Sequence, residues 1–147
     1  MIIYLLSVLV LAILLYHFFI WKPLDTSVLY KNQPYLLFGH RGSPTQEPEN
    51  TITSFQRALA DGCNAIELDV HRTRDGHLVV FHDDTVERTS NGTGRVAEHT
   101  LAELKSLNVA KEWEGREERI PLLQEVVDAL PDTTIFNFEI KNFSFFS

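Results

Sequence analysis

The stretch NAIELDVH, residues 64–71, decides the fold that we expect for this chain. Apolar and polar residues alternate along it, which is the pattern of a β-strand whose successive side chains point to opposite faces. One face carries aliphatic residues and the other polar ones: Ile66, Leu68 and Val70 against Glu67, Asp69 and His71. We therefore predict a strand that buries its aliphatic face and holds two carboxylates, Glu67 and Asp69, together on the opposite face.

Six further segments have the periodicity or the capping residues of regular structure. They predict strands over 35–40, 78–82 and 135–141 and helices over 52–60, 100–107 and 121–130. The helix over 121–130 is expected to bury its aliphatic residues: Leu122, Leu123, Val126, Val127 and Leu130. Residues 84–99 are polar and rich in turn formers, so we expect an excursion outside the core. The resulting order, β-α-β-β-excursion-α-β, is typical of an α/β fold.

The first part of the chain differs in composition from the rest. Residues 2–21 are almost wholly apolar, and a helix of that length spans about 30 Å, the thickness of a bilayer core. No basic residue precedes this run and no small-residue cleavage site ends it, so we expect an uncleaved transmembrane anchor over residues 1–21. The expected location is therefore a membrane, with a single crossing. Lys22 and Lys31 are too few to decide on which side the rest of the chain lies.

Length and composition constrain the rest of the chain. We expect a linker over residues 22–34 and a single domain over residues 35–147. The 147-residue chain has 13 basic and 20 acidic residues and a formal net charge of −7, so nucleic acid is not expected as a partner. A single cysteine, Cys63, excludes an internal disulfide and is expected to be a small buried side chain.

Charged residues close four of the predicted strands. They are His40 and Arg41, Glu67 and Asp69, His82 and Asp83, and Glu139 and Lys141. Each charge could simply lie in solvent, but four strands with the same feature favour one shared site, because α/β barrel enzymes build their sites at the carboxyl ends of strands. Three converging carboxylates would repel one another without a cation, and oxygen ligands suit Mg²⁺ or Ca²⁺. The sequence therefore predicts a divalent-metal site.

The connection between Asp69 and His82 is too short to contain a crossover helix. A two-residue turn at Asp75 and Gly76 would make a hairpin in which Asp69 and His82 face each other on one side. A short irregular crossover could bring His82 to the same rim. We favour the hairpin, although the sequence leaves both possible.

These residues and their order resemble the glycerophosphodiester phosphodiesterase family. The resemblance runs from about residue 36 to residue 141. Its motifs are His40-Arg41-Gly42, Glu49-Asn50-Thr51, Glu67-Leu68-Asp69-Val70, Thr73-Arg74-Asp75-Gly76, Val79-Val80-Phe81-His82-Asp83, Arg88-Thr89, Gly92 with Gly94, Thr100 with Glu103-Leu104, Ile120-Pro121, and Glu139-Ile140-Lys141. A lone His-Arg-Gly is a weak signal, whereas this ordered set is a strong one.

The resemblance implies a distorted (β/α)₈ barrel that hydrolyses glycerophosphodiesters, or lysophospholipids, with the help of a divalent metal. Carried over residue by residue, it implies that the metal ligands are Glu67, Asp69 and Glu139. It also implies that the acid–base residues are His40 and His82 and that the phosphate-binding residues are Arg41 and Lys141. A hydroxyl group of the substrate can serve as the nucleophile in such enzymes. Histidine titrates near neutrality, which suits proton transfer in both directions. No such role falls on His71, His77 or His99, which are expected at the surface.

The length departs from the family pattern. A complete barrel of this type needs about 250 residues, whereas residues 35–147 reach only the fourth predicted strand. We therefore expect a truncated barrel of about four strands. This leaves two alternatives: a membrane-anchored enzyme acting on glycerophosphodiesters or lysophospholipids, or an inactive remnant that cannot close its barrel.

Overall fold

The computed structural model describes residues 2–20, 22 and 34–141, and the chain divides into two compact units at Pro34. In the first unit, helix α1 (Ile2–Phe19) forms where the apolar run predicts a helix. The apolar side chains of α1 from Tyr4 onward are exposed. Among the residues that the structure describes, no helix has the length and apolar character that a membrane crossing requires. The predicted transmembrane anchor is therefore not supported: 18 helical residues rise only about 27 Å.

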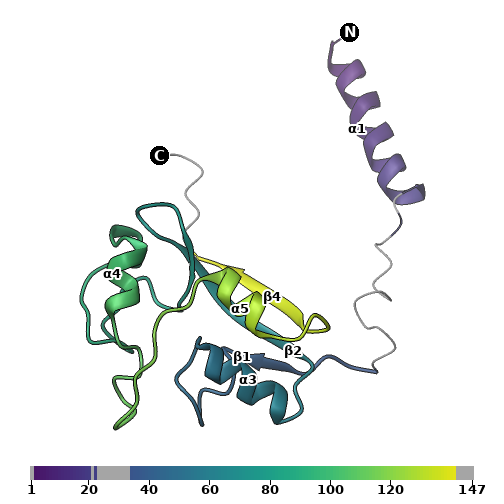
Figure 1. The fold of residues 1–147 in the computed structure, drawn as a ribbon. Helices are drawn as coiled ribbons and strands as arrows, with labels where there is room; N and C mark the ends of the chain where they lie inside the picture. Colours follow the sequence, from purple (N-terminus) through teal and green to yellow (C-terminus); the bar gives the residue numbers. More distant parts are fainter. Residues whose placement is uncertain (1, 21, 23–33, 142–147) are drawn as a thin grey trace. The chain divides into compact units, whose positions relative to one another are not determined.

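The second unit is built on a four-stranded sheet around β2 (Ala65–Arg72). Figure 1 shows β2 beside β1 and β4. Strands β1 (Phe38–His40) and β4 (Ile135–Ile140) run parallel to β2. Strand β3 (Leu78–Val80) runs antiparallel to its last residues. The predicted α/β class is confirmed, with a partial parallel sheet.

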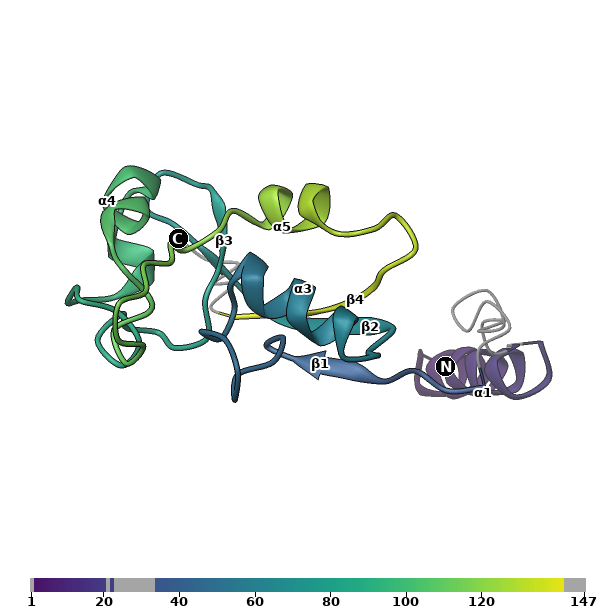
Figure 2. The ribbon, with the colours of Figure 1, turned by 60° about the horizontal axis from the view of Figure 1, so that its bottom comes forward.

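Two helices cover one face of this sheet (Figure 2). They are α3 (Ile52–Ala60) and α5 (Leu123–Ala129). Their apolar side chains form a core with the aliphatic face of β2 and with β3: Phe55, Ala58, Ile66, Leu68, Val70, Val80, Val126 and Leu130. The helices therefore occupy the face that the alternation of β2 marks as apolar, and the face with Glu67 and Asp69 is left for other contacts.

Capping fixes where the helices begin. The Thr51 hydroxyl oxygen accepts a hydrogen bond from the Ser54 N–H at the start of α3. Helix α4 (Leu101–Ser106) begins with the predicted capping box of Thr100 and Glu103. In α5 the expectation is wrong for Val127, which is 39% exposed. This helix is only seven residues long, so a single position, Val126, is fully buried within it.

The predicted excursion is not outside the core. Val86 and Val96 are fully buried in a second cluster together with β3, α4 and the residues beyond α4. Its members are Val79, Phe81, Val86, Val96, Leu104, Val109 and Ile120. These apolar residues are spaced too irregularly to give a helix or strand period, so the polar composition of residues 84–99 conceals them.

Strands β2 and β3 form a hairpin, but the predicted register is wrong by one residue. His71 pairs with Val79 and Arg72 with Leu78, and the Phe81 N–H donates to the Asp69 carbonyl over 3.0 Å. The loop is longer than two residues, because Arg72 and Leu78 are the last paired residues and 73–77 lie between them. Within the loop, the Thr73 hydroxyl accepts a hydrogen bond from the His77 N–H. A slip of one residue exchanges the faces of a strand. Asp69 therefore pairs with Phe81, and His82 does not face it.

Candidate active site and metal centre

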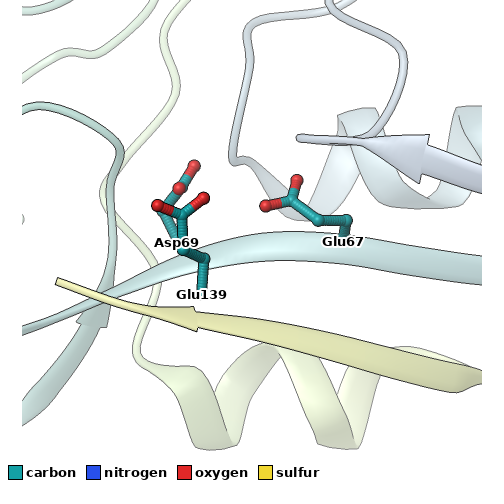
Figure 3. Close-up of side chains that lie close together, drawn as sticks. All are labelled: Glu67, Asp69 and Glu139. Atoms are coloured by element: carbon teal, nitrogen blue, oxygen red, sulfur yellow. The ribbon is translucent and has the colours of Figure 1, made fainter.

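Strand register brings three carboxylates together. Asp69 of β2 lies directly beside Glu139 of β4, and Glu67 lies two residues before Asp69 on the same face of β2. One oxygen of each of the three carboxylates lies within 4.8 Å of the others. Figure 3 shows the three side chains rising from the two strands on the same side. The convergence follows from parallel pairing, since neighbouring strands then end at one edge of the sheet.

Asp69 is the most enclosed of the three. Its residue is fully buried, whereas the Glu139 side chain is 53% exposed. The Asn50 amide donates to Asp69 Oδ2 over 2.9 Å and fixes the carboxylate plane. Asn50 can do so because its backbone takes a left-handed conformation, with φ of 56°. The site therefore has a rigid, buried end at Asp69 and an open end at Glu139.

The donor set fits a hard divalent cation. Asp69 Oδ1 is buried, yet it accepts no hydrogen bond from any described residue. The Lys141 ammonium lies 3.1 Å from this oxygen as an ion pair without hydrogen-bond geometry. Lys141 and Arg41 offset part of the negative charge of the cluster, but three carboxylates within 4.8 Å of one another carry one negative charge more than these two cations balance. Glu67 and Glu139 supply further oxygen ligands at that point, so these residues fit Mg²⁺ or Ca²⁺.

The loop after β1 positions Arg41. Its backbone is left-handed, with φ of 57°, and its N–H donates to Glu67 Oε2 over 3.1 Å. Its guanidinium lies between two carboxylates, 3.6 Å from Asp69 and 3.4 Å from Glu49. Gly42 follows with φ of 87°, and a Cβ there would lie 2.3 Å from the Ser54 hydroxyl oxygen. The His40-Arg41-Gly42 sequence thus makes a turn that only glycine can complete.

The second predicted cation also reaches the carboxylates. Lys141 follows β4 and pairs with both Glu139 and Asp69. Burial disfavours its ammonium form, but these contacts outweigh that effect and raise the pKa of Lys141. Arg41 and Lys141 therefore offer two positive groups on either side of Asp69.

The two predicted acid–base histidines have different surroundings. His40 ends β1 beside Glu67, with its Nε2 atom 3.8 Å from Glu67 Oε2, and its side chain is 67% exposed. The Nδ1 atom of His82 lies 2.5 Å from Asp83 Oδ1. His82 therefore contacts Asp83 and not Asp69, in agreement with the shifted hairpin register. Another histidine departs from expectation: His71 is buried and its Nε2 atom lies 3.2 Å from the His82 carbonyl oxygen.

Sequence reasoning missed a charged network beside His82. Arg88 contacts both carboxylate oxygens of Asp83, at 2.6 and 3.0 Å, and both of Glu49, at 3.0 and 2.6 Å. The Arg88 hydrogen bonds lower the pKa of Asp83 to about 2. Burial opposes ionisation of Glu49, but Arg88 and Arg41 outweigh it and lower the pKa of Glu49. The signal that could have identified this network was the presence of Glu49, Asp83 and Arg88 in three of the motifs that resemble the family.

Acid is expected to remove stability through this network. A carboxyl group whose pKa is lower in the folded chain stabilises the fold above its unfolded pKa, about 3.9 for aspartate, and loses that contribution as the pH falls. For Asp83 the loss runs from about pH 4 to about pH 2. The Asp83→Asn variant should therefore lose less free energy of unfolding over that range than the wild type, measured by urea unfolding at each pH. Asp128→Asn, which alters an exposed carboxylate on α5, should retain the wild-type pH dependence. Equal pH dependence in all three proteins would contradict the prediction.

A cavity of about 300 Å³ adjoins the network. Its apolar walls are Pro44, Pro48, Val109 and Trp113, and its charged lining residues are Glu49, Arg88 and Glu112. Glu49 contacts Arg41, and Arg88 contacts Asp83. A small organic group in the cavity would therefore lie close to the residues that surround the carboxylates.

Comparisons with known proteins agree on one family. A model of the glycerophosphoryl diester phosphodiesterase family matches residues 40–145. A glycerophosphodiester phosphodiesterase of Caldanaerobacter subterraneus is 47% identical over 110 residues, which are 73% of this chain and 45% of that protein. Rat glycerophosphodiester phosphodiesterase 1 is 36% identical over 138 residues, 87% of this chain and 41% of that protein.

Solved structures give the same result. A glycerophosphodiester phosphodiesterase from Agrobacterium tumefaciens has a TM-score of 0.69 and 34% identity, covering 73% of this chain and 47% of that one. An Oleispira antarctica phosphodiesterase in complex with the product sn-glycerol-3-phosphate has a TM-score of 0.66 and 37% identity, covering 73% and 44%. The chain spans about half the length of the curated relatives it matches. Its sequence and fold place it in the glycerophosphoryl diester phosphodiesterase family.

Proposed function

We propose that this protein hydrolyses glycerophosphodiesters to glycerol 3-phosphate and an alcohol. The observation that carries the proposal is the convergence of Glu67, Asp69 and Glu139 at one edge of the sheet, with Arg41 and Lys141 paired to Asp69. The names of the relatives support the same reaction class. The product found in the Oleispira antarctica structure supports glycerol 3-phosphate as the group retained by the site.

Glu67, Asp69 and Glu139 would hold Mg²⁺ or Ca²⁺. When bound, the cation supplies Lewis-acid stabilisation of charge on a phosphoryl oxygen. Arg41 and Lys141 bind the phosphate group, because guanidinium and ammonium groups donate charge-assisted hydrogen bonds to phosphate oxygens. Both lie beside the buried Asp69, at the proposed metal site. Their pairing with carboxylates orients them before a substrate arrives.

His40 and His82 move protons. Either imidazole can take a proton from an attacking hydroxyl and the other can give one to the departing alkoxide, since histidine exchanges protons near neutral pH. A neighbouring hydroxyl of the glycerol group serves as the nucleophile and displaces the alcohol, which leaves a cyclic glycerol phosphate. A water molecule then opens this ring to give glycerol 3-phosphate, so the protein itself need not supply a nucleophile. His40 is well exposed at the end of β1, which leaves its ring accessible to a substrate.

Lysophospholipids are a second substrate class. The exposed apolar side chains of α1 support a location at a lipid surface, where such substrates are found. Co-flotation of the full chain with phosphatidylcholine vesicles tests that location. Full-chain protein that stays at the bottom of the gradient would exclude that location. Equal flotation of a Leu9→Lys, Ile13→Lys variant would show that α1 is not what binds the vesicles.

Activity of the full chain distinguishes the enzyme from the inactive remnant. We expect release of glycerol 3-phosphate from glycerophosphocholine with Mg²⁺ or Ca²⁺, loss of release on addition of EDTA, and recovery with excess cation. The presence of all seven predicted site positions within residues 40–141 favours the enzyme. Folded protein that releases no product with either cation would favour the remnant, and release unaffected by EDTA would refute the metal assignment.

A further inference from the structure

In the charged network beside His82, one arginine binds two carboxylates at once, and one of these carboxylates contacts the histidine ring. Arg88 makes four short contacts, two to Asp83 and two to Glu49, and Asp83 contacts the His82 ring in turn. Glu49 also contacts Arg41. The network therefore joins His82, two residues after β3, to the loop that carries Arg41.

The contact between His82 and Asp83 defines which ring nitrogen carries hydrogen. A carboxylate only accepts hydrogen bonds, so the His82 nitrogen facing it, Nδ1, must be the protonated one. In the neutral ring the lone pair then lies on Nε2. That nitrogen is the one left to take a proton from a substrate, or to return it.

Arg88 keeps Asp83 ionised and fixes the position of its carboxylate, so that Asp83 can accept the hydrogen bond from His82 Nδ1. A guanidinium that contacts both oxygens fixes the plane of a carboxylate and favours its ionised state. The second pair of contacts, to Glu49, fixes the guanidinium itself. Glu49 is 17% exposed and Asp83 is 27% exposed, so both carboxylates are partly shielded from competing water.

We propose that Asp83 and Arg88 are positioning residues that keep His82 in its Nδ1–H form, with Nε2 turned to proton exchange. The role rests on the proposed hydrolase function, because it assigns a task to a histidine of that reaction. It reaches beyond that function in one respect: the tautomer of His82 is a property of the resting chain. It can therefore be measured without substrate or activity.

Nitrogen NMR of the full chain tests the tautomer directly. Long-range proton–nitrogen correlations distinguish protonated from unprotonated ring nitrogens, and a His82→Gln variant identifies the signal among the six histidines. Near pH 8 we expect His82 to be protonated at Nδ1 in the wild type. Asp83→Ala should shift it toward the Nε2–H form that imidazole side chains prefer in water. A wild-type ring protonated at Nε2, or an unchanged Asp83→Ala spectrum in folded protein, would overturn the proposal.

Kinetics of the Arg88 variants provide the second test. Arg88→Ala should lower kcat by at least about 10-fold and change KM little. The loss should not exceed the roughly 10²- to 10⁴-fold that a general acid or base contributes. Arg88→Lys should recover only part of the loss, because lysine cannot contact both carboxylates in two-point fashion. The matched control is Arg57→Ala, which removes the Arg57–Asp61 pair on α3 and should retain wild-type kcat.

The two tests separate failure of this proposal from failure of the proposed function. If the chain is inactive, the NMR result still decides whether Asp83 sets the tautomer. If the chain is active and Arg88→Ala raises KM without lowering kcat, the network binds substrate and does not position His82. Should Asp83→Ala fail to fold, Arg88→Ala gives the same spectroscopic readout, with a partial shift of the His82 ring toward the Nε2–H form.

Discussion

Replacing Asp69 by asparagine is expected to lower the affinity for Mg²⁺ or Ca²⁺ by about 100-fold or more and to abolish hydrolysis of glycerophosphocholine. Substitution of residues that only hydrogen-bond to metal ligands lowers metal affinity by about 10- to 100-fold, so loss of a ligand itself should lower it by at least as much. Asp69 is the fully buried member of the group, and its Oδ1 atom lies 3.1 Å from the Lys141 ammonium. The substitution also leaves Arg41 and Lys141 beside an uncharged group.

Calorimetric titration of the full chain with each cation measures the first effect, and product release measures the second. Asparagine keeps the shape of aspartate and can still accept from Asn50, so the variant should remain folded. Glu117→Gln, which removes an exposed carboxylate paired to Arg119, is the matched control and should titrate as the wild type does. Unchanged cation affinity in folded Asp69→Asn protein would remove Asp69 from the metal centre.

The carboxylate cluster was predictable because it depends on alternation within strands and on the carboxyl ends of parallel strands meeting at one edge of the sheet. Alternation within residues 64–71 places Glu67 and Asp69 on one face, and parallel pairing of β4 with β2 sets Glu139 beside Asp69. Both features survive small errors in element boundaries, since a strand that begins one residue late keeps its faces. Their convergence is therefore a finding that sequence reasoning anticipated, while the role of each residue in catalysis stays a prediction.

The position of His82 was not predictable to the same precision. It depends on the register of a hairpin, and that register depends on how many residues the loop contains. The Asp75 and Gly76 pair suggests a two-residue turn, but side-chain bonds of Thr73 to His77 N–H and to Asp75 close a longer loop. A difference of one residue in the register moved His82 away from Asp69.

The buried His71 and the second core were missed for a related reason. His71 lies on the polar face of β2, and its burial comes from the chain that returns through residues 79–82. Val86 and Val96 lie within polar sequence and are buried by α4 and by residues near Ile120. Contacts between segments distant in sequence decide these environments, and no local period records them.

Substituting alanine for His40 is expected to lower kcat for glycerophosphocholine by about 10²- to 10⁴-fold, the contribution typical of a general acid or base. His40 ends β1 beside Glu67, and its side chain is 67% exposed, so few packing contacts are lost and the fold should persist. The same exposure leaves room for a small molecule in place of the ring. Added imidazole should therefore restore part of the activity of His40→Ala, which a purely structural role would not allow.

The matched control is His77→Ala, which removes a half-exposed imidazole from the β2–β3 loop. It should retain wild-type kcat and show no response to imidazole. Calorimetric titration separates proton transfer from metal binding, because His40→Ala should bind Mg²⁺ or Ca²⁺ nearly as the wild type does if Glu67, Asp69 and Glu139 supply the ligands. Near-normal turnover by His40→Ala would exclude His40 from proton transfer. A loss of cation affinity as large as that of Asp69→Asn would instead make His40 part of the metal centre.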